Sequence, residues 1–356
     1  MAKDSVLQNI YEQPKVIEEL VVHYLDQDGL RRQLQLLQTR KFANIIITGM
    51  GTSFFSGYPA FLYLQAQGMI HVHHVDASEL LHYHMQSVGD DTLLILVSQS
   101  GESYEIVKIL ETIRNANSNP VILGLTMTDQ DTTLKRHATI CLPLAKTEET
   151  TLGAFKSFTA SILLLMFTAQ FICPAGLEIH QMRHEIIHLK NLIIKEIDYW
   201  QKYFKDTAMA EPAALCFIGR GPCLCAAQGA ALIATELAKI NAMVFGGGQF
   251  RHGPIEMAAS HANQYVVLAP CGKTQDICLN LANELSTFKE DVLLLTADTS
   301  LAENDHLQIL RMPAIDEFWA SVLYSVPLQL FAYQLAVRKG IEPGTARIIS
   351  KVTLFE

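Results

Sequence analysis

The stretch Thr92-Leu-Leu-Ile-Leu-Val-Ser-Gln-Ser-Gly-Glu-Ser103 decides the fold class of this chain and holds its best candidate for a binding site. Its first six residues form an apolar run typical of a buried strand, and a helical pattern follows from Tyr104 to Ile113. The free N–H groups at the start of a helix bind anions. The turn adds neutral donors: Ser98, Gln99, Ser100 and Ser103. This composition suits the phosphate of a small polar metabolite, although an ordinary serine-rich helix cap has the same sequence features.

Short apolar runs alternate with helical patterns along the whole chain, which is typical of βαβ units and a parallel sheet. The expected strands of the first half are 44–48, 70–75, 92–97, 121–126 and 139–143. Those of the second half are 214–218, 242–245, 265–269, 292–296 and 308–312. We therefore expect an α/β fold.

The two halves begin alike, which indicates an internal duplication. Residues 45–53 (IIITGMGTS) and 215–223 (LCFIGRGPC) each read as a strand, a Gly-x-Gly turn and a helix start. We expect two flavodoxin-like domains, each with a parallel sheet flanked by helices and a ligand near the carboxyl ends of the strands. The expected divisions are an N-terminal helical extension (1–28), a first domain (29–175), a connector helix (176–206), a second domain (207–340) and a C-terminal tail near the site (341–356).

Composition excludes several classes of partner and compartment. The chain has 356 residues, 49% hydrophobic and 18% charged, with a net charge of −9. This acidic balance argues against nucleic acid and anionic membranes as partners. The apolar segment 162–173 is too short to cross a bilayer, and the N-terminus lacks the apolar core of a signal peptide. Seven scattered cysteines indicate a reducing compartment, so we expect a cytoplasmic protein.

Two short motifs invite other functions. Gly49-Met-Gly51, followed by Asp76, resembles a dinucleotide fingerprint, but Phe54 stands where the third glycine belongs. His184-Glu-Ile-Ile-His188 matches the zinc motif HExxH, yet no third ligand follows at a telling distance. We interpret these histidines, and the runs 71–74 and 82–84, as surface or strand-end residues. No metal or redox cofactor is expected.

The second half carries the best candidates for proton transfer. Glu236 lies in an apolar helix expected over 226–240, where a carboxylate needs a partner or a raised pKa. A glycine-rich loop follows, Gly247-Gly-Gln-Phe-Arg-His-Gly-Pro254, and His252 near its end suits proton transfer to a sugar oxygen. The plain alternative is that Glu236 lies on a polar face and that His252 only caps the loop.

Four ordered motifs resemble the isomerase region of glucosamine-6-phosphate synthase, a pair of sugar isomerase (SIS) domains. They lie at residues 50–53 (MGTS), 98–103 (SQSGES), 250–254 (FRHGP) and 326–333 (VPLQLFAY), and the resemblance covers nearly the whole chain. It implies that Glu236 moves a proton between C1 and C2 and that His252, from a second subunit, assists ring opening. It also implies a homodimer with a shared active site. The residues implied to hold the sugar phosphate are Thr52, Ser53, Ser98, Gln99, Ser100 and Ser103.

Several positions depart from the synthase pattern. Ala2 replaces the cysteine nucleophile of the glutaminase domain, so we expect that glutamine is not the ammonia source. Ile233 replaces the lysine three residues before the glutamate, and Ala154 replaces a ligand-contacting serine. Ser350 occupies the place of the C-terminal lysine, with Lys351 one residue later as a candidate sugar-binding residue.

These departures favour the stand-alone relatives of the synthase. We expect an amino-sugar 6-phosphate deaminase/isomerase that converts glucosamine-6-phosphate, or a close relative, to fructose-6-phosphate and ammonia. A fructosamine-6-phosphate deglycase would use the same glutamate and is the alternative. A sugar-phosphate sensor without turnover is a further one, although such regulators usually pair one SIS domain with a DNA-binding domain.

Overall fold

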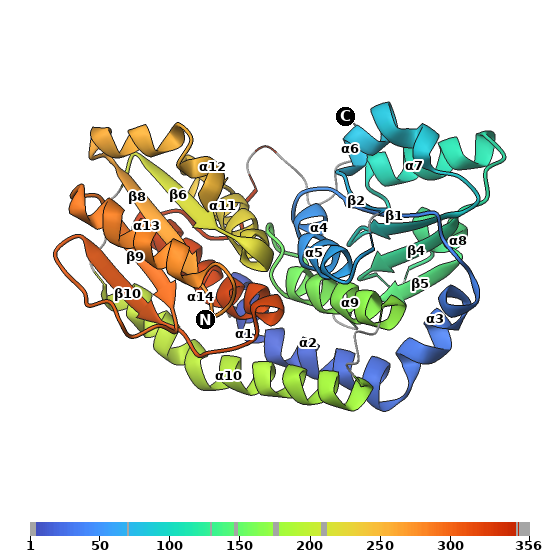
Figure 1. The fold of residues 1–356 in the computed structure, drawn as a ribbon, viewed down its shortest axis with the longest axis horizontal. Helices are drawn as coiled ribbons and strands as arrows, with labels where there is room; N and C mark the ends of the chain where they lie inside the picture. Colours follow the sequence, from blue (N-terminus) through green and yellow to red (C-terminus); the bar gives the residue numbers. More distant parts are fainter. Residues whose placement is uncertain are drawn as a thin grey trace. The chain divides into compact units, whose positions relative to one another are not determined.

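The computed structural model describes residues 5–69, 71–128, 130–145, 149–173, 178–207, 212–346 and 348. The chain divides into two compact units (Figure 1). The first domain runs from Glu12 to Lys190. The second domain runs from Asn191 to Thr345 and includes the N-terminal helix α1 (Ser5–Tyr11). The division falls within one long helix, α10 (Ile179–Asp206), where a connector helix was expected.

The first domain contains a five-stranded parallel sheet in the order β2-β1-β3-β4-β5. The strands are β1 (Asn44–Gly49), β2 (Val72–His74), β3 (Thr92–Val97), β4 (Val121–Thr126) and β5 (Ile140–Pro143). Every residue of β3 and β4 is buried, because helices cover both faces of a parallel sheet. Gly49 at the end of β1 pairs with Val97 at the end of β3, so both strands end at one edge.

Two layers of helices bury this sheet. The short helices after β1, β2 and β4 are α4 (Thr52–Phe55), α6 (Ala77–Glu79), η2 (Leu80–His84), η3 (Met85–Ser87) and α8 (Thr133–His137). The longer ones are α5 (Tyr58–Ala66), α7 (Tyr104–Asn115) and α9 (Lys156–Ile172). The apolar stripe of α7 packs on one face of the sheet through Ile106, Ile109 and Leu110.

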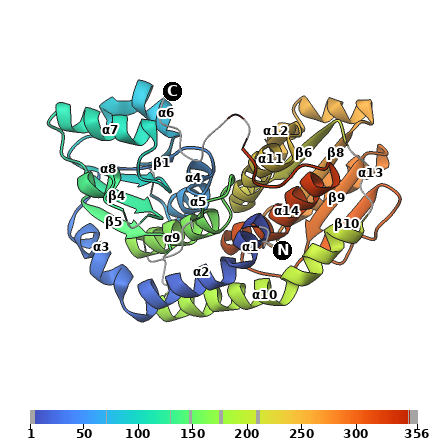
Figure 2. The ribbon, with the colours of Figure 1, turned by 180° about the vertical axis from the view of Figure 1, so that it is seen from behind.

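Helices from the start of the domain pack against α9. They are α2 (Gln13–Leu20) and α3 (Gly29–Thr39), which are joined by the π-helix η1 (Val21–Asp26). Polar contacts fix α2 on α9: Lys156 Nζ lies 2.8 Å from Glu12 Oε2, and the Thr159 hydroxyl donates to Gln13 Oε1 at 2.5 Å. Figure 2 shows α9 between the sheet and these helices.

The second domain repeats this architecture. Its parallel sheet has the order β10-β9-β8-β6-β7, with β6 (Ala214–Gly219), β7 (Ala242–Gly246), β8 (Asn263–Ala269), β9 (Asp291–Thr296) and β10 (Leu307–Arg311). Its helices are η4 (Gly221–Cys223), α11 (Leu224–Ala238), α12 (Gly247–Phe250), η5 (Pro254–Ser260), α13 (Gln275–Thr287) and α14 (Glu317–Arg338). Taken from the first strand of each domain, both sheets read 2-1-3-4-5, which is the flavodoxin-like order. The expected fold class is confirmed.

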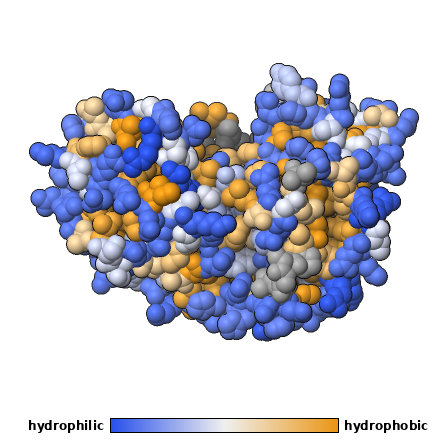
Figure 3. All heavy atoms as spheres, viewed as in Figure 1, coloured by the Kyte–Doolittle hydropathy of each residue, from blue (hydrophilic) through white to orange (hydrophobic). Residues whose placement is uncertain are grey.

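The most apolar helices of the chain are buried inside the fold. By length and composition alone, two segments are apolar enough to cross a membrane: Gly221–Ala238 and Glu317–Arg338. Of these segments, 67% and 94% respectively is buried inside the fold, where α11 and α14 pack against each other. Helix α9, which contains most of the apolar segment 162–173, is buried along nearly its whole length. Charged and polar side chains cover much of the face shown in Figure 3.

Candidate active site

The turn after β1 presents two hydroxyl side chains at the carboxyl edge of the first sheet. Gly51 adopts φ 53° and ψ −128°, a conformation that favours glycine, and α4 begins directly after it with Thr52 and Ser53. A β-carbon at Gly49 would lie 2.8 Å from the carbonyl oxygen of Val97. The glycines therefore let the Thr52–Ser53 turn approach the neighbouring strand β3 closely.

The turn after β3 is held together by its own hydroxyl groups. Ser98 is 2% exposed, and its Oγ accepts the N–H of Gly101 at 3.1 Å. The Oγ atoms of Ser98 and Ser103 lie 3.1 Å apart. Ser103 is the N-cap residue of α7, but its hydroxyl does not bond to the N–H groups of that helix. The first turn of α7 therefore keeps donors for a ligand, beside a pair of hydroxyls.

Other contacts fix the neighbouring side chains of this turn. The carbonyl of Gln99 accepts the Met127 N–H and the Thr126 hydroxyl, each at 3.0 Å, and its side-chain Nε2 donates to the Glu149 carbonyl at 3.2 Å. Ser100 Oγ accepts the N–H of Glu102 at 3.2 Å. Gln99 and Ser100 thus have protein partners that shape the turn.

These two turns meet where the strand order reverses. Strands β1 and β3 are neighbours, and the chain leaves β1 toward β2 on the opposite side. In open α/β sheets this switch point is where ligands bind. Residues 49–53 and 98–103 contain no lysine, arginine or histidine, so an anion there is held by hydroxyls and by the N–H groups of α7. The structure brings together the predicted residues Thr52, Ser53, Ser98, Gln99, Ser100 and Ser103 within one domain.

Glu236 lies in the last turn of α11, in the second domain. Its side chain is partly buried and its Oε2 atom is shielded from solvent, while Ile233 one turn earlier is fully buried in the core. The expected helix 226–240 ends at Ala238, because Lys239 adopts a left-handed conformation with φ 51°. The Lys239 ammonium contacts the carbonyl of Glu236 and lies 3.3 Å from that of Thr345. Sequence reasoning did not select Lys239, although a lysine three residues after the glutamate was a visible signal.

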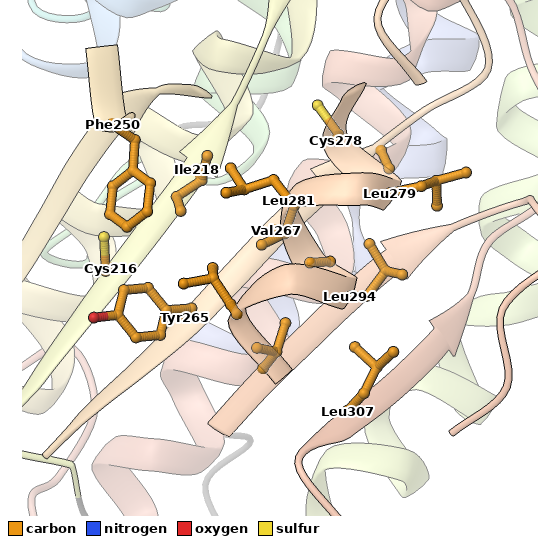
Figure 4. Close-up of a cluster of buried hydrophobic side chains, with 14 of the residues drawn as sticks. Cys216, Ile218, Phe250, Tyr265, Val267, Cys278, Leu279, Leu281, Leu294 and Leu307 are labelled. Atoms are coloured by element: carbon orange, nitrogen blue, oxygen red, sulfur yellow. The ribbon is translucent and has the colours of Figure 1, made fainter. Parts of the chain in front are cut away.

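His252 lies in a loop whose neighbours are anchored. Phe250 is fully buried, with its ring 5.8 Å from that of Tyr265 between centroids (Figure 4). Arg251 forms an ion pair with Glu284 of α13 at 2.6 Å. The His252 side chain is exposed, and Gly253 follows it with φ 123°. Anchored neighbours and an exposed imidazole suit a group that acts on a ligand from a fixed position.

Glu149 is a supporting residue that sequence reasoning missed. Its carboxylate is 4% exposed and accepts the N–H groups of Phe155 and Lys156, both at 2.9 Å, together with the Ser157 hydroxyl. Its carbonyl accepts the amide of Gln99. Glu149 thus joins the start of α9 to the turn after β3. Nothing in its local sequence indicates this role.

Asp76, His184 and His188 of the two rejected motifs lie outside the turns described above. Asp76 caps α6, accepting the N–H groups of Ser78 at 3.1 Å and Glu79 at 3.0 Å. His184 and His188 are exposed on α10. Across the described ranges no three His, Cys, Asp or Glu residues are grouped to hold a metal ion, and all seven cysteines are free. Lys351 and Ser350 lie outside the described residues.

Comparison with known proteins agrees with the duplicated fold. Glutamine–fructose-6-phosphate aminotransferase [isomerizing] from Pyrococcus horikoshii is 29% identical over 359 residues, which cover 99% of this chain and 58% of that protein. The similar enzyme from Bartonella henselae is 27% identical over 98% of this chain, and again 58% of its own length. The chain thus spans somewhat more than half the length of these relatives.

Solved structures share the fold along nearly the whole chain. The C-terminal domain of glucosamine-fructose-6-phosphate aminotransferase from Francisella tularensis has a TM-score of 0.83 and 24% identity, covering 97% of this chain and 98% of that one. Glucosamine-6-phosphate deaminase from Thermotoga maritima has a TM-score of 0.77 and 19% identity, over 98% and 99% of the two chains. A family model described as the SIS domain matches residues 37–170 and 209–339. With both of its domains matched, the chain belongs to the SIS domain family.

Proposed function

We propose that this protein is an amino-sugar 6-phosphate deaminase/isomerase, acting on glucosamine-6-phosphate or a close relative. The observation that carries the proposal is the hydroxyl pair of Ser98 and Ser103 at the start of α7, which forms a neutral phosphate site at the β1/β3 switch point. Similarity over almost the whole chain to the isomerizing aminotransferases supports a sugar phosphate as the ligand.

Phosphate recognition belongs to the first domain in this proposal. The oxygens of the phosphate accept bonds from the hydroxyls of Ser53, Ser98 and Ser103 and from the first N–H groups of α7. Thr52, Gln99 and Ser100 complete the turn around it. Because these donors are uncharged, the site selects a phosphate group over other ligands by the number and direction of its hydrogen bonds and not by its net charge.

The second domain supplies the proton-transfer groups. His252 protonates the ring oxygen, which opens the sugar to its aldehyde form. Glu236 then removes the proton from C2 and returns it to C1. A second proton passes from the amino nitrogen to the C1 oxygen, so that the C1 aldehyde becomes an alcohol and the amine at C2 becomes an imine. Water adds to the imine, and ammonia leaves, which gives fructose-6-phosphate. The balance is one water consumed and one ammonia released, without an oxidant or reductant.

The assembly proposed with this mechanism is a homodimer in a reducing, cytoplasmic compartment, with His252 contributed by a second copy of the chain. Support comes from the exposure of His252 on an anchored loop. Lys351 remains a proposed sugar-binding residue.

The first experiment measures ammonia and fructose-6-phosphate released by the purified protein from glucosamine-6-phosphate. We expect the two products in equal amounts and none from unphosphorylated glucosamine. If neither product forms, release of amines from 6-phosphorylated fructosamines would establish a deglycase. Binding without turnover of either class would establish a sensor.

Replacing the proposed base tests the mechanism. Glu236→Gln keeps the shape of the side chain but cannot accept the proton, so we expect kcat to fall by about 100-fold or more with a small change in KM. The matched control is Glu79→Gln, at an exposed carboxylate in α6 of the first domain. Full activity of Glu236→Gln would contradict the mechanism.

A further inference from the structure

The second domain has a switch point of its own, between β6 and β8. Gly219-Arg220-Gly221 ends β6 there, as Gly49-Met50-Gly51 ends β1 in the first domain. The backbone turns in the same way at the second glycine, since φ is 53° at both Gly51 and Gly221. The residue between the glycines differs: methionine in the first domain and arginine in the second.

The guanidinium of Arg220 lies against glycine backbone. A β-carbon at Gly247 would come within 2.7 Å of Arg220 Nε, and one at Gly248 would lie 3.5 Å from Nη1. These two glycines begin α12, directly after β7. The absence of side chains at both positions therefore makes room for the arginine at the carboxyl edge of the second sheet.

The positive charge of Arg220 has no partner within the part of the chain that the structure describes. Its Nε is shielded from solvent and has no acceptor, and its guanidinium forms no ion pair with a described carboxylate. The nearby thiol of Cys278 on α13 does not neutralise it. Burial raises the pKa of Cys278 to about 11, with Arg220 acting in the opposite direction, so the thiol is uncharged at neutral pH. A partly buried guanidinium without an anion is unfavourable, because it is charged at every physiological pH.

Open space adjoins the same turn. An added β-carbon at Gly221 or at Gly246 would meet no described atom within 4 Å. Gly221 directly follows Arg220, and Gly246 ends β7, the strand beside β6. The loop after β8 ends at the same edge of the sheet and adds the exposed Lys273. An arginine with room beside it, and a lysine at the same edge of the sheet, are what a small oxyanion requires.

We propose that Arg220 forms a second anion site, which takes inorganic phosphate or the phosphate group of a small metabolite. This Arg220 site lies wholly within the second domain and is independent of the reaction proposed above. The chain would thus bind two phosphates: one through the hydroxyls of the first domain, the other through the guanidinium of the second. The same point of a duplicated fold would carry two different chemistries for one kind of ligand.

Equilibrium dialysis of the full chain with radiolabelled inorganic phosphate tests this proposal. We expect two equivalents bound per chain in the wild type. Arg220→Met places at this position the residue found at position 50. This variant should bind one equivalent of phosphate fewer, or bind that equivalent at least tenfold more weakly. Arg220→Lys should weaken the same equivalent less, because it keeps the charge and loses the two-pronged geometry. Arg114→Met, at an exposed arginine on α7, is the matched control and should bind like the wild type.

A double variant separates the two sites. Ser98→Ala with Ser103→Ala should remove only the equivalent bound in the first domain, and adding Arg220→Met should remove both. If Arg220→Met binds two equivalents with unchanged affinity, the Arg220 site does not exist. A wild type that binds one equivalent, lost in the double serine variant, would also overturn the proposal while leaving the phosphate site of the first domain intact. A change in oligomeric state without a change in phosphate binding would show that a carboxylate of another copy is the partner of Arg220, and would overturn it too.

Discussion

At the scale of single residues, the hydroxyl of Ser103 is better placed to bind a phosphate than the side chains of its neighbours. Its hydroxyl faces Ser98 and does not cap its own helix, whereas Gln99 and Ser100 already bond to the protein. Loss of a hydrogen bond to a charged group costs about 1.5–3 kcal/mol. We therefore expect Ser103→Ala to raise KM for the sugar phosphate by roughly tenfold or more with a smaller change in kcat. Steady-state kinetics check this against Ser87→Ala, an exposed serine of η3.

His74 predicts a pH dependence of stability. It stacks on Phe54 at 4.0 Å between ring centroids, and its Nε2–H donates to the Phe54 carbonyl at 2.8 Å, which holds the helix that begins with Thr52 and Ser53. Burial lowers the pKa of His74 from 6.5 to about 4, while that hydrogen bond and Asp76 act in the opposite direction. The unfolded chain therefore takes up the proton first as pH falls.

The stabilising contribution of neutral His74 is present above pH 6.5 and is lost as pH falls toward 4. At pH 5 the loss is about 2 kcal/mol. Urea unfolding at about pH 7.5 and pH 5 checks this value, with the non-titrating variant His74→Gln as reference. We expect the free energy of unfolding to fall more in the wild type than in the variant. Equal losses would show that His74 does not remain neutral in the folded protein.

At the scale of elements, the turn after β3 depends on one glycine. Gly101 has φ 69°, and a β-carbon there would lie 2.5 Å from Thr132 Oγ1. Gly68, after α5, has φ 85° with open space around it. Gly68→Ala therefore meets only the backbone cost of about 1 kcal/mol, whereas Gly101→Ala adds a clash and should lose roughly 3 kcal/mol. Urea unfolding of both variants compares the two, and equal losses would mean that Thr132 does not confine the turn.

The strands and the principal helices were predictable because their signals are local. Each expected strand is present, and most boundaries agree within two residues, since buried parallel strands read as apolar runs. Helix α11 ends two residues before the expected end at 240, because Lys239 adopts a left-handed conformation that the sequence does not indicate. The role of Glu149 was not predictable for a different reason. Its partners include Gln99, fifty residues away, and such a contact exists only after the sheet has brought the turns together.

At the scale of the whole molecule, one duplicated topology presents two different sets of side chains at its strand ends. The edge of the first sheet presents serine and threonine hydroxyls, and that of the second sheet presents Arg220, with Glu236 and His252 on the segments that follow β6 and β7. A net charge of −9 gives no general attraction for an anionic ligand, so each anion must be captured by local donors. Duplication supplies two sets of strand ends on which binding and proton transfer can be placed separately.

If His252 acts on the substrate of a second copy, activity can be restored by mixing two inactive variants. In a mixed dimer of Glu236→Gln and His252→Asn chains, one site lacks both groups, but the other combines the intact Glu236 of one copy with the intact His252 of its partner. Random pairing makes about half of all dimers mixed, each with one working site of two, so about a quarter of wild-type activity should return.

The ammonia assay measures this after the two variants are co-expressed with different affinity tags. Dimers purified through both tags are all mixed and should approach about half of wild-type activity. Each variant expressed alone is the control. Mixed dimers as inactive as the single variants would show that Glu236 and His252 act within one copy.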